Sequence, residues 1–142
     1  MSAAVFTGAS RYWSPRMSLG MAAVDACHRE LLEELARLED APDREFAASY
    51  VRFVARVEHD FREEEEFMER TAFSGLPSHR EQHARMLGGL HHVARQVMAG
   101  DLAAGRDVVA LMPGWFMLHI ETMDGAFAPS TLLAEKRLQR RL

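Results

Sequence analysis

Residues 53–68, FVARVEHDFREEEEFM, decide the fold, because an apolar stripe and two carboxylates fall on one side of the helix they predict. The apolar positions recur every three or four residues, as they do on one face of an α-helix, at Phe53, Val57, Phe61 and Met68. Asp60 and Glu64 continue that line, and residues four apart lie nearly above one another on a helix. A buried carboxylate is costly unless it is paired or bound to a metal. The stretch therefore predicts a polar site inside a helical core.

Working outward, the chain predicts a first helix from Asp25, which can cap it, to about residue 39. Pro42 ends this segment, since proline cannot continue a helix interior. Asp43 can then cap a second helix over residues 44–70, which contains the stretch quoted above.

Two more helices are expected downstream. Ser78 followed by Glu81 has the pattern of a capping box and predicts a third helix that ends at Gly100. A fourth helix is expected from near Arg106 to about residue 127, and residues 113–114, a proline and a glycine, should kink or split it.

Four amphipathic helices with short connections, and no alternating run long enough for a strand, predict an all-α fold. We expect an up-down-up-down four-helix bundle in a single domain, residues 1–142. Within it, residues 1–24 form an extended N-terminal arm, residues 25–128 the bundle, and residues 129–142 a basic C-terminal tail.

The composition narrows the class of protein. The net charge of −4 argues against a nucleic-acid-binding protein, which normally carries a basic patch. The one cysteine, Cys27, excludes an intramolecular disulfide and favours a reducing compartment. We expect no signal peptide and no membrane span, because no charged segment followed by an apolar run opens the chain and no apolar stretch approaches about 20 residues. These features predict a cytoplasmic protein; they do not predict its oligomeric state.

Every predicted helix carries at least one side chain able to ligate a metal on its inner face. These candidates are His28, Asp60, Glu64, His79, His83, His119 and Asp124. Histidines and carboxylates at a spacing of four on facing helices are how bundles build metal sites, and the donor set suits iron, zinc, copper or manganese. We therefore interpret the constellation as a metal site.

A purely structural interpretation exists for each candidate taken alone. A single inward histidine is more often a hydrogen-bonded core residue than a ligand. Glu64 belongs to a run of four glutamates, and such runs usually mark a solvated face. Asp124 lies five residues after His119, an imperfect helical repeat, and could face water. Cys27 is expected to be a small packed residue.

The motifs resemble those of the hemerythrin family, specifically its bacterial domains, from Trp13 to about residue 127. Residues 24–28, Val-Asp-Ala-Cys-His, are similar to the first-ligand segment, and residues 61–68 to the family's HFxxEExxM segment. His79 and His83 match HxxxH, and residues 115–124 match WxxxHIxxxD.

This resemblance implies a non-heme centre of two iron ions that binds dioxygen or a similar small ligand in an apolar pocket. By the same resemblance, one iron has three imidazole ligands, His79, His83 and His119, and His28 ligates the other. Glu64 and Asp124 would bridge the two irons. The pocket would be lined by Trp115, Phe116 and Ile120.

One position departs from the family motif, which has histidine immediately before Phe61, where this chain has Asp60. His59 is adjacent, but a shift of one residue rotates a side chain by about 100° and places it on the polar face, with Arg52, Arg56, Glu63 and Glu66. We therefore expect Asp60 to be the ligand and His59 to be a surface residue. Because a carboxylate adds negative charge, it should favour ferric iron and make reversible oxygen binding harder to maintain.

Three functions remain open at this point. The first is an oxygen-binding two-iron protein for storage, delivery or sensing, which we expect in preference to an enzyme. The second is a diiron oxidase or peroxidase, and the third is a bundle with an altered metal site that acts as an interaction module.

Overall fold

The computed structural model describes residues 11–124 and 126, apart from the side chains of residues 123 and 124. Its long helices are α1 (Ala22–Asp40), α2 (Asp43–Arg70), α3 (Leu76–Met98) and α4 (Leu102–His119). A short 3₁₀ turn, η2 (Pro15–Met17), precedes them, and a π turn, η3 (Ile120–Asp124), follows α4 directly. The expected C-terminal tail and residues 1–10 of the expected arm lie outside the described residues.

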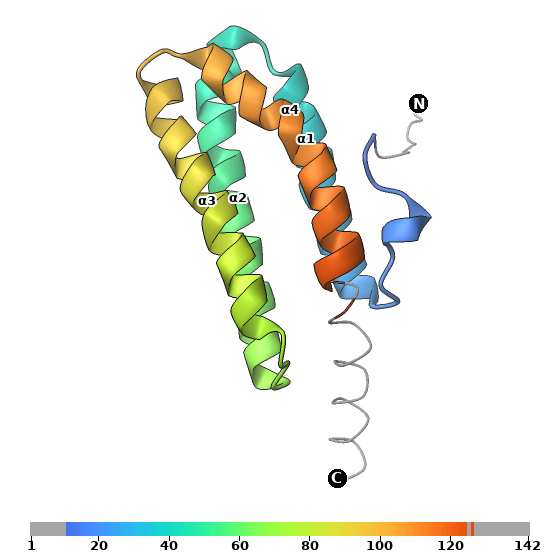
Figure 1. The fold of residues 1–142 in the computed structure, drawn as a ribbon. Helices are drawn as coiled ribbons and strands as arrows, with labels where there is room; N and C mark the ends of the chain where they lie inside the picture. The colour runs from blue at the N-terminus through green and yellow to red at the C-terminus, as the bar shows by residue number, and fades with distance from the viewer. Residues whose placement is uncertain (1–10, 125, 127–142) are drawn as a thin grey trace, which may run out of the picture.

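The four helices form the expected all-α bundle (Figure 1). Each helix packs against its neighbours in the chain, and α1 also packs against α4, which closes the bundle. Successive helices run in opposite directions, and the short links 41–42, 71–75 and 99–101 permit no other arrangement. Over the described part of the chain there is no strand, and no helix is long and apolar enough to cross a membrane.

The start of α1 differs from the expectation, since the helix begins at Ala22 and Asp25 lies in its first turn. The carboxylate of Asp25 accepts hydrogen bonds from the Ser18 hydroxyl at 2.6 Å and the Leu19 backbone N–H at 2.8 Å. Asp25 therefore holds the preceding segment onto α1 instead of capping the helix end. That segment also buries Met17 in the core.

The starts of α3 and α4 were also predicted too late. Helix α3 begins at Leu76 without a side-chain cap, so the predicted box of Ser78 and Glu81 is wrong. Pro77 explains the early start, because proline in the first turn loses no helical hydrogen bond. Helix α4 is capped by Asp101, whose carboxylate accepts from the Ala104 N–H at 3.1 Å. It then continues through residues 113 and 114, so it is not split there.

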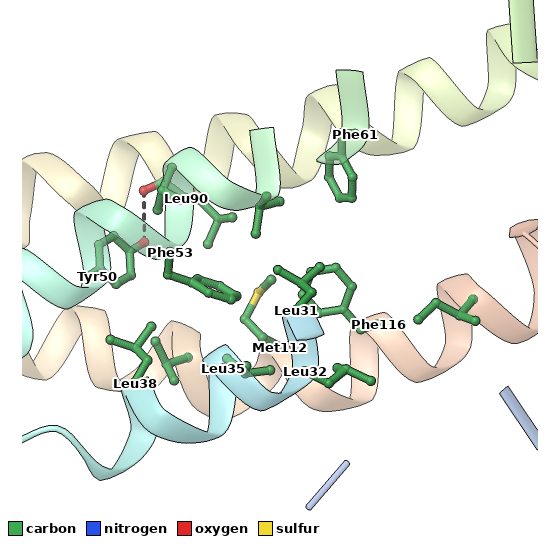
Figure 2. Packing of buried hydrophobic residues seen from close by; sticks show 14 of the residues in the cluster. Leu31, Leu32, Leu35, Leu38, Tyr50, Phe53, Phe61, Leu90, Met112 and Phe116 are labelled. Carbon is green, nitrogen blue, oxygen red and sulfur yellow. Dashed lines mark hydrogen bonds between the residues drawn. The ribbon is translucent and has the colours of Figure 1, made fainter. Parts of the chain in front are cut away.

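The core consists of apolar side chains from all four helices, and Figure 2 shows how they meet between them. The hydroxyl of Tyr50, which is fully buried, donates to the Leu90 carbonyl oxygen at 2.9 Å and so ties α2 to α3. Phe61 and Phe116 lie towards one end of this core, where their rings contact each other. They also border a cavity that polar residues, among them Glu64 and His119, help to line.

Gly105 allows α4 to approach α2 and α3 closely. A Cβ atom at this position would lie 2.6 Å from both Phe46 Cε1 and Val97 Cγ2, which is closer than carbon atoms can pack. At Gly114, on the same helix, a Cβ atom would meet nothing within 4 Å. A side chain therefore has no room at Gly105 but has free space at Gly114 of the same helix.

We predict that Gly105→Ala lowers the free energy of unfolding by about 1–3 kcal/mol, because the extra methyl group overpacks the core. Gly114→Ala should instead raise it by up to about 1 kcal/mol, because alanine loses less backbone entropy in a helix. Urea denaturation of the metal-free variants measures both values. Equal stability of the two variants would contradict the close approach at Gly105.

Candidate metal centre

Helices α2, α3 and α4 bring four predicted ligands to one point inside the bundle. Glu64 of α2, His79 and His83 of α3, and His119 of α4 each offer one ligand atom, and these atoms lie within 4.8 Å of one another. The three histidine side chains are buried. Four sequence-predicted residues from three helices therefore form one compact donor set.

Hydrogen bonds from the far side of two rings determine where the ring protons reside. The Nδ1 atom of His83 lies 2.7 Å from a carboxylate oxygen of Glu65, and carboxylate oxygens only accept, so Nδ1 donates. The Nδ1 atom of His119 lies 3.1 Å from the side-chain oxygen of Gln82, which is also an acceptor. In neutral rings, both Nε2 atoms then carry lone pairs.

Those two lone pairs face each other, since the Nε2 atoms of His83 and His119 are 3.2 Å apart. Two acceptors repel at this distance unless a cation lies between them. Ligand nitrogens bound at about 2.1 Å and at right angles around a metal would be about 3 Å apart. The tautomers and the spacing thus fit a metal ion, and the residues behind the rings orient them as such partners do in metalloproteins.

The two carboxylate oxygens of Glu64 face histidines on different sides of the residue. Its Oε1 lies 3.0 Å from Nε2 of His79 and 3.3 Å from Nε2 of His83, and its Oε2 lies 3.6 Å from Nε2 of His28. Burial raises the pKa of Glu64, but the imidazoles of His28, His79 and His83 outweigh burial and hold it well below its ordinary value. Glu64 is therefore an anion whose two oxygens face different histidines, His79 and His83 on one side and His28 on the other.

Aromatic rings fix the orientation of the same imidazoles. Phe61 stacks on His83 with 3.7 Å between ring centroids and an interplanar angle of 6°. Trp115 stacks on His119 at 4.6 Å and 10°. The rings of His83 and His119 are thus held by a hydrogen bond on one edge and a stacked ring on one face.

The side of the site at His28 opens into a mostly apolar cavity of about 220 Å³. Phe116 and Ile120, two of the three predicted pocket residues, line it, together with Leu31 and Phe67. The third predicted residue, Trp115, does not border this cavity and lies against His119 instead. The polar and charged residues among those that line it include His28, Glu64, His119, Asp60 and Glu63.

Asp60 borders the same cavity, and its side chain is only 10% exposed. Its two carboxylate oxygens accept hydrogen bonds from Nε of Arg56 at 2.9 and 3.1 Å. His59 is 58% exposed and lies 3.2 Å from a carboxylate oxygen of Glu63, so it faces solvent as its helical phase predicts. Of these two neighbours, Asp60 is the one that faces the site.

The last predicted ligand, Asp124, has a side chain outside the described residues. Its backbone belongs to η3, which begins immediately after His119. Residues five apart differ by about 140° around an α-helix, but hydrogen bonds in a π turn span five residues. Residues five apart therefore lie closer to one face in a π turn than they do in an α-helix.

Sequence reasoning missed the partners behind the ligands. Glu65 was interpreted as part of a solvated acidic face, and Gln82 was not singled out. Arg56 was assigned to the polar face of α2, although its side chain is only 28% exposed. The available signal was adjacency, because Glu65 follows Glu64 and Gln82 precedes His83.

Comparison with known proteins agrees with this geometry. Residues 19–130 match the family described as the hemerythrin HHE cation binding domain. This chain belongs to the hemerythrin family. A bacteriohemerythrin of Ralstonia nicotianae is 37% identical over 112 residues, which cover 79% of this chain and 82% of that protein. A myohemerythrin of Sipunculus nudus is 23% identical over 112 residues, 79% of this chain and 86% of that protein.

Family and geometry together confirm the expected function at the level of the family: the chain is a dioxygen-binding protein with a non-heme two-iron centre. The donor set fits iron, since imidazoles and carboxylates are the ligands of non-heme iron sites. When bound, ferrous iron supplies the electrons that a dioxygen ligand withdraws. The chain itself supplies oriented lone pairs, a fixed carboxylate and an apolar cavity.

We predict that Glu65→Gln lowers the affinity for ferrous iron about 10- to 100-fold, because His83 loses the charged acceptor that fixes its tautomer. Glu66→Gln is the matched control, since Glu66 is exposed on the same helix and the variant has the same net charge. Anaerobic competition with a chelator measures the affinity. Equal affinities of the two variants would contradict the orienting role of Glu65.

Proposed function

We propose that this hemerythrin binds dioxygen reversibly, for storage, delivery or sensing, at the metal position nearest His28. The observation that carries the proposal is the apolar cavity, which borders His28 and Glu64. Dioxygen is small and uncharged, so it loses little hydration free energy on entering such a space. We further propose a cytoplasmic location, which fits a single reduced cysteine.

In this proposal the two metal positions have different ligands. His79, His83 and His119 serve one position, and His28 serves the other. Glu64 is proposed to bridge them because its two oxygens face the two groups. On the grounds of the family resemblance, Asp124 is proposed as a second bridge and Asp60 as a ligand beside His28.

The apolar wall also controls what accompanies dioxygen. Leu31, Phe116 and Ile120 offer no proton donor and no hydrogen-bond partner that would order water. Protons and water promote the loss of bound dioxygen as a reduced product, so excluding them favours release of dioxygen unchanged.

A diiron oxidase or peroxidase is the second candidate, and Asp60 is the observation that favours it. Without a countercharge, a carboxylate at the usual histidine position stabilises ferric iron and so favours net oxidation. A third candidate, an interaction module with an altered metal site, requires that the donor set hold no iron.

Anaerobic loading with ferrous iron followed by air separates the three candidates. Reversible binding predicts two iron ions per chain after gel filtration and an absorption change that reverses when dioxygen is removed. Rapid, irreversible oxidation would show the oxidase, and loss of iron during gel filtration would show the interaction module.

We predict that Asp60→His prolongs the oxygenated state at least severalfold, because a neutral imidazole replaces a carboxylate that favours ferric iron. The decay of the absorption band in air-saturated buffer measures its lifetime. His59→Gln is the control, since this neighbour is exposed and should leave the lifetime unchanged. An unchanged lifetime in Asp60→His would contradict the role assigned to Asp60.

A further inference from the structure

Arg56 lies on α2 one turn before Asp60, and its guanidinium group reaches three carboxylates. Nε donates to both oxygens of Asp60, at 2.9 and 3.1 Å. Nη1 lies 3.4 Å from Glu34 and Nη2 lies 3.2 Å from Glu30, both on α1. The contact with Asp60 is thus the shortest and the only one that engages both oxygens of a carboxylate.

The environment of the three acids differs. The Glu30 side chain is 65% exposed and that of Glu34 is 27% exposed, whereas that of Asp60 is 10% exposed. Water screens the charge of an exposed carboxylate, but it screens a buried one poorly. The charge of Arg56 therefore acts chiefly on Asp60.

Cys27 is a further titratable group at this pair. Burial, and next the charge of Asp60, raise the pKa of its thiol to about 11, so the thiol is neutral near pH 7. It adds no charge to balance or oppose that of Asp60.

We propose that Arg56 is a positioning residue that supplies the countercharge of Asp60 at the iron site. The inference rests on the proposed function in taking Asp60 as a ligand beside His28. Asp60 and Arg56 together carry no net charge. In this respect the pair is equivalent to the neutral imidazole at the corresponding position of the family motif. The pair thus offsets the preference for ferric iron that a carboxylate alone would impose. Hydrogen bonds to both oxygens also fix the orientation of the carboxylate.

The test measures the ferric–ferrous equilibrium of iron-loaded protein by spectroelectrochemistry at pH 8. Arg56→Gln should shift the equilibrium at least tenfold towards ferric iron, because Asp60 loses its countercharge. Asp60→Asn should shift it at least tenfold towards ferrous iron. The double variant should return to within threefold of the unchanged protein, since both charges are gone.

Two further variants separate charge from structure. Arg52→Gln is the matched control, because Arg52 is exposed one turn earlier on α2, where it donates to Ser49. Arg56→Lys keeps the charge and should stay within threefold of the unchanged protein. Urea unfolding of the metal-free variants should show that the effects of Arg56→Gln and Asp60→Asn are not additive.

The proposal is overturned if Arg56→Gln shifts the equilibrium no more than Arg52→Gln, or if the double variant keeps the shift of Arg56→Gln. Iron that is retained but oxidised irreversibly by air would refute reversible binding, and the charge pattern of the variants would still be measured. Failure of the unchanged protein to hold iron would refute both.

Discussion

Two imidazole lone pairs that face each other across 3.2 Å inside a helical bundle are the constraint on which the rest of the structure depends. Such an arrangement is unfavourable without a cation, so the protein must enforce it. Glu65 and Gln82 hold the ring protons on the far side, and stacked aromatic rings prevent rotation. The apolar core supplies the free energy that keeps these groups together. The stability of the bundle is thus partly used to preorganise a site for a positive ion.

The bundle and most of the donor set could be predicted because both depend on helical phase. Apolar stripes predicted four helices, and the same phase separated Asp60 from His59. Helix starts were not predictable in the same way, because capping residues compete with tertiary partners. Asp25 could have capped α1, yet it binds Ser18 and Leu19, which the fold brings near.

Helical phase also fails to predict where the end group of a long side chain lies. A helical position fixes where Cβ points, but the guanidinium of an arginine can reach far from it. Arg56 therefore starts at the border of the polar face and ends against a buried carboxylate. Partners of this kind come from neighbouring helices or from the next turn, and their identity depends on how the helices pack.

The π turn after α4 shows how one extra residue can be accommodated at a site without lengthening the protein elsewhere. Relative to an α-helix, it acts as a one-residue insertion confined to residues 120–124. Deleting a residue there would turn the rest of this turn by about 100° relative to α4 and shift it by about 1.5 Å. The angular position of residues 120–124 relative to His119 is thus set by the kind of helical turn, and evolution can adjust it there without altering the three helices that precede α4.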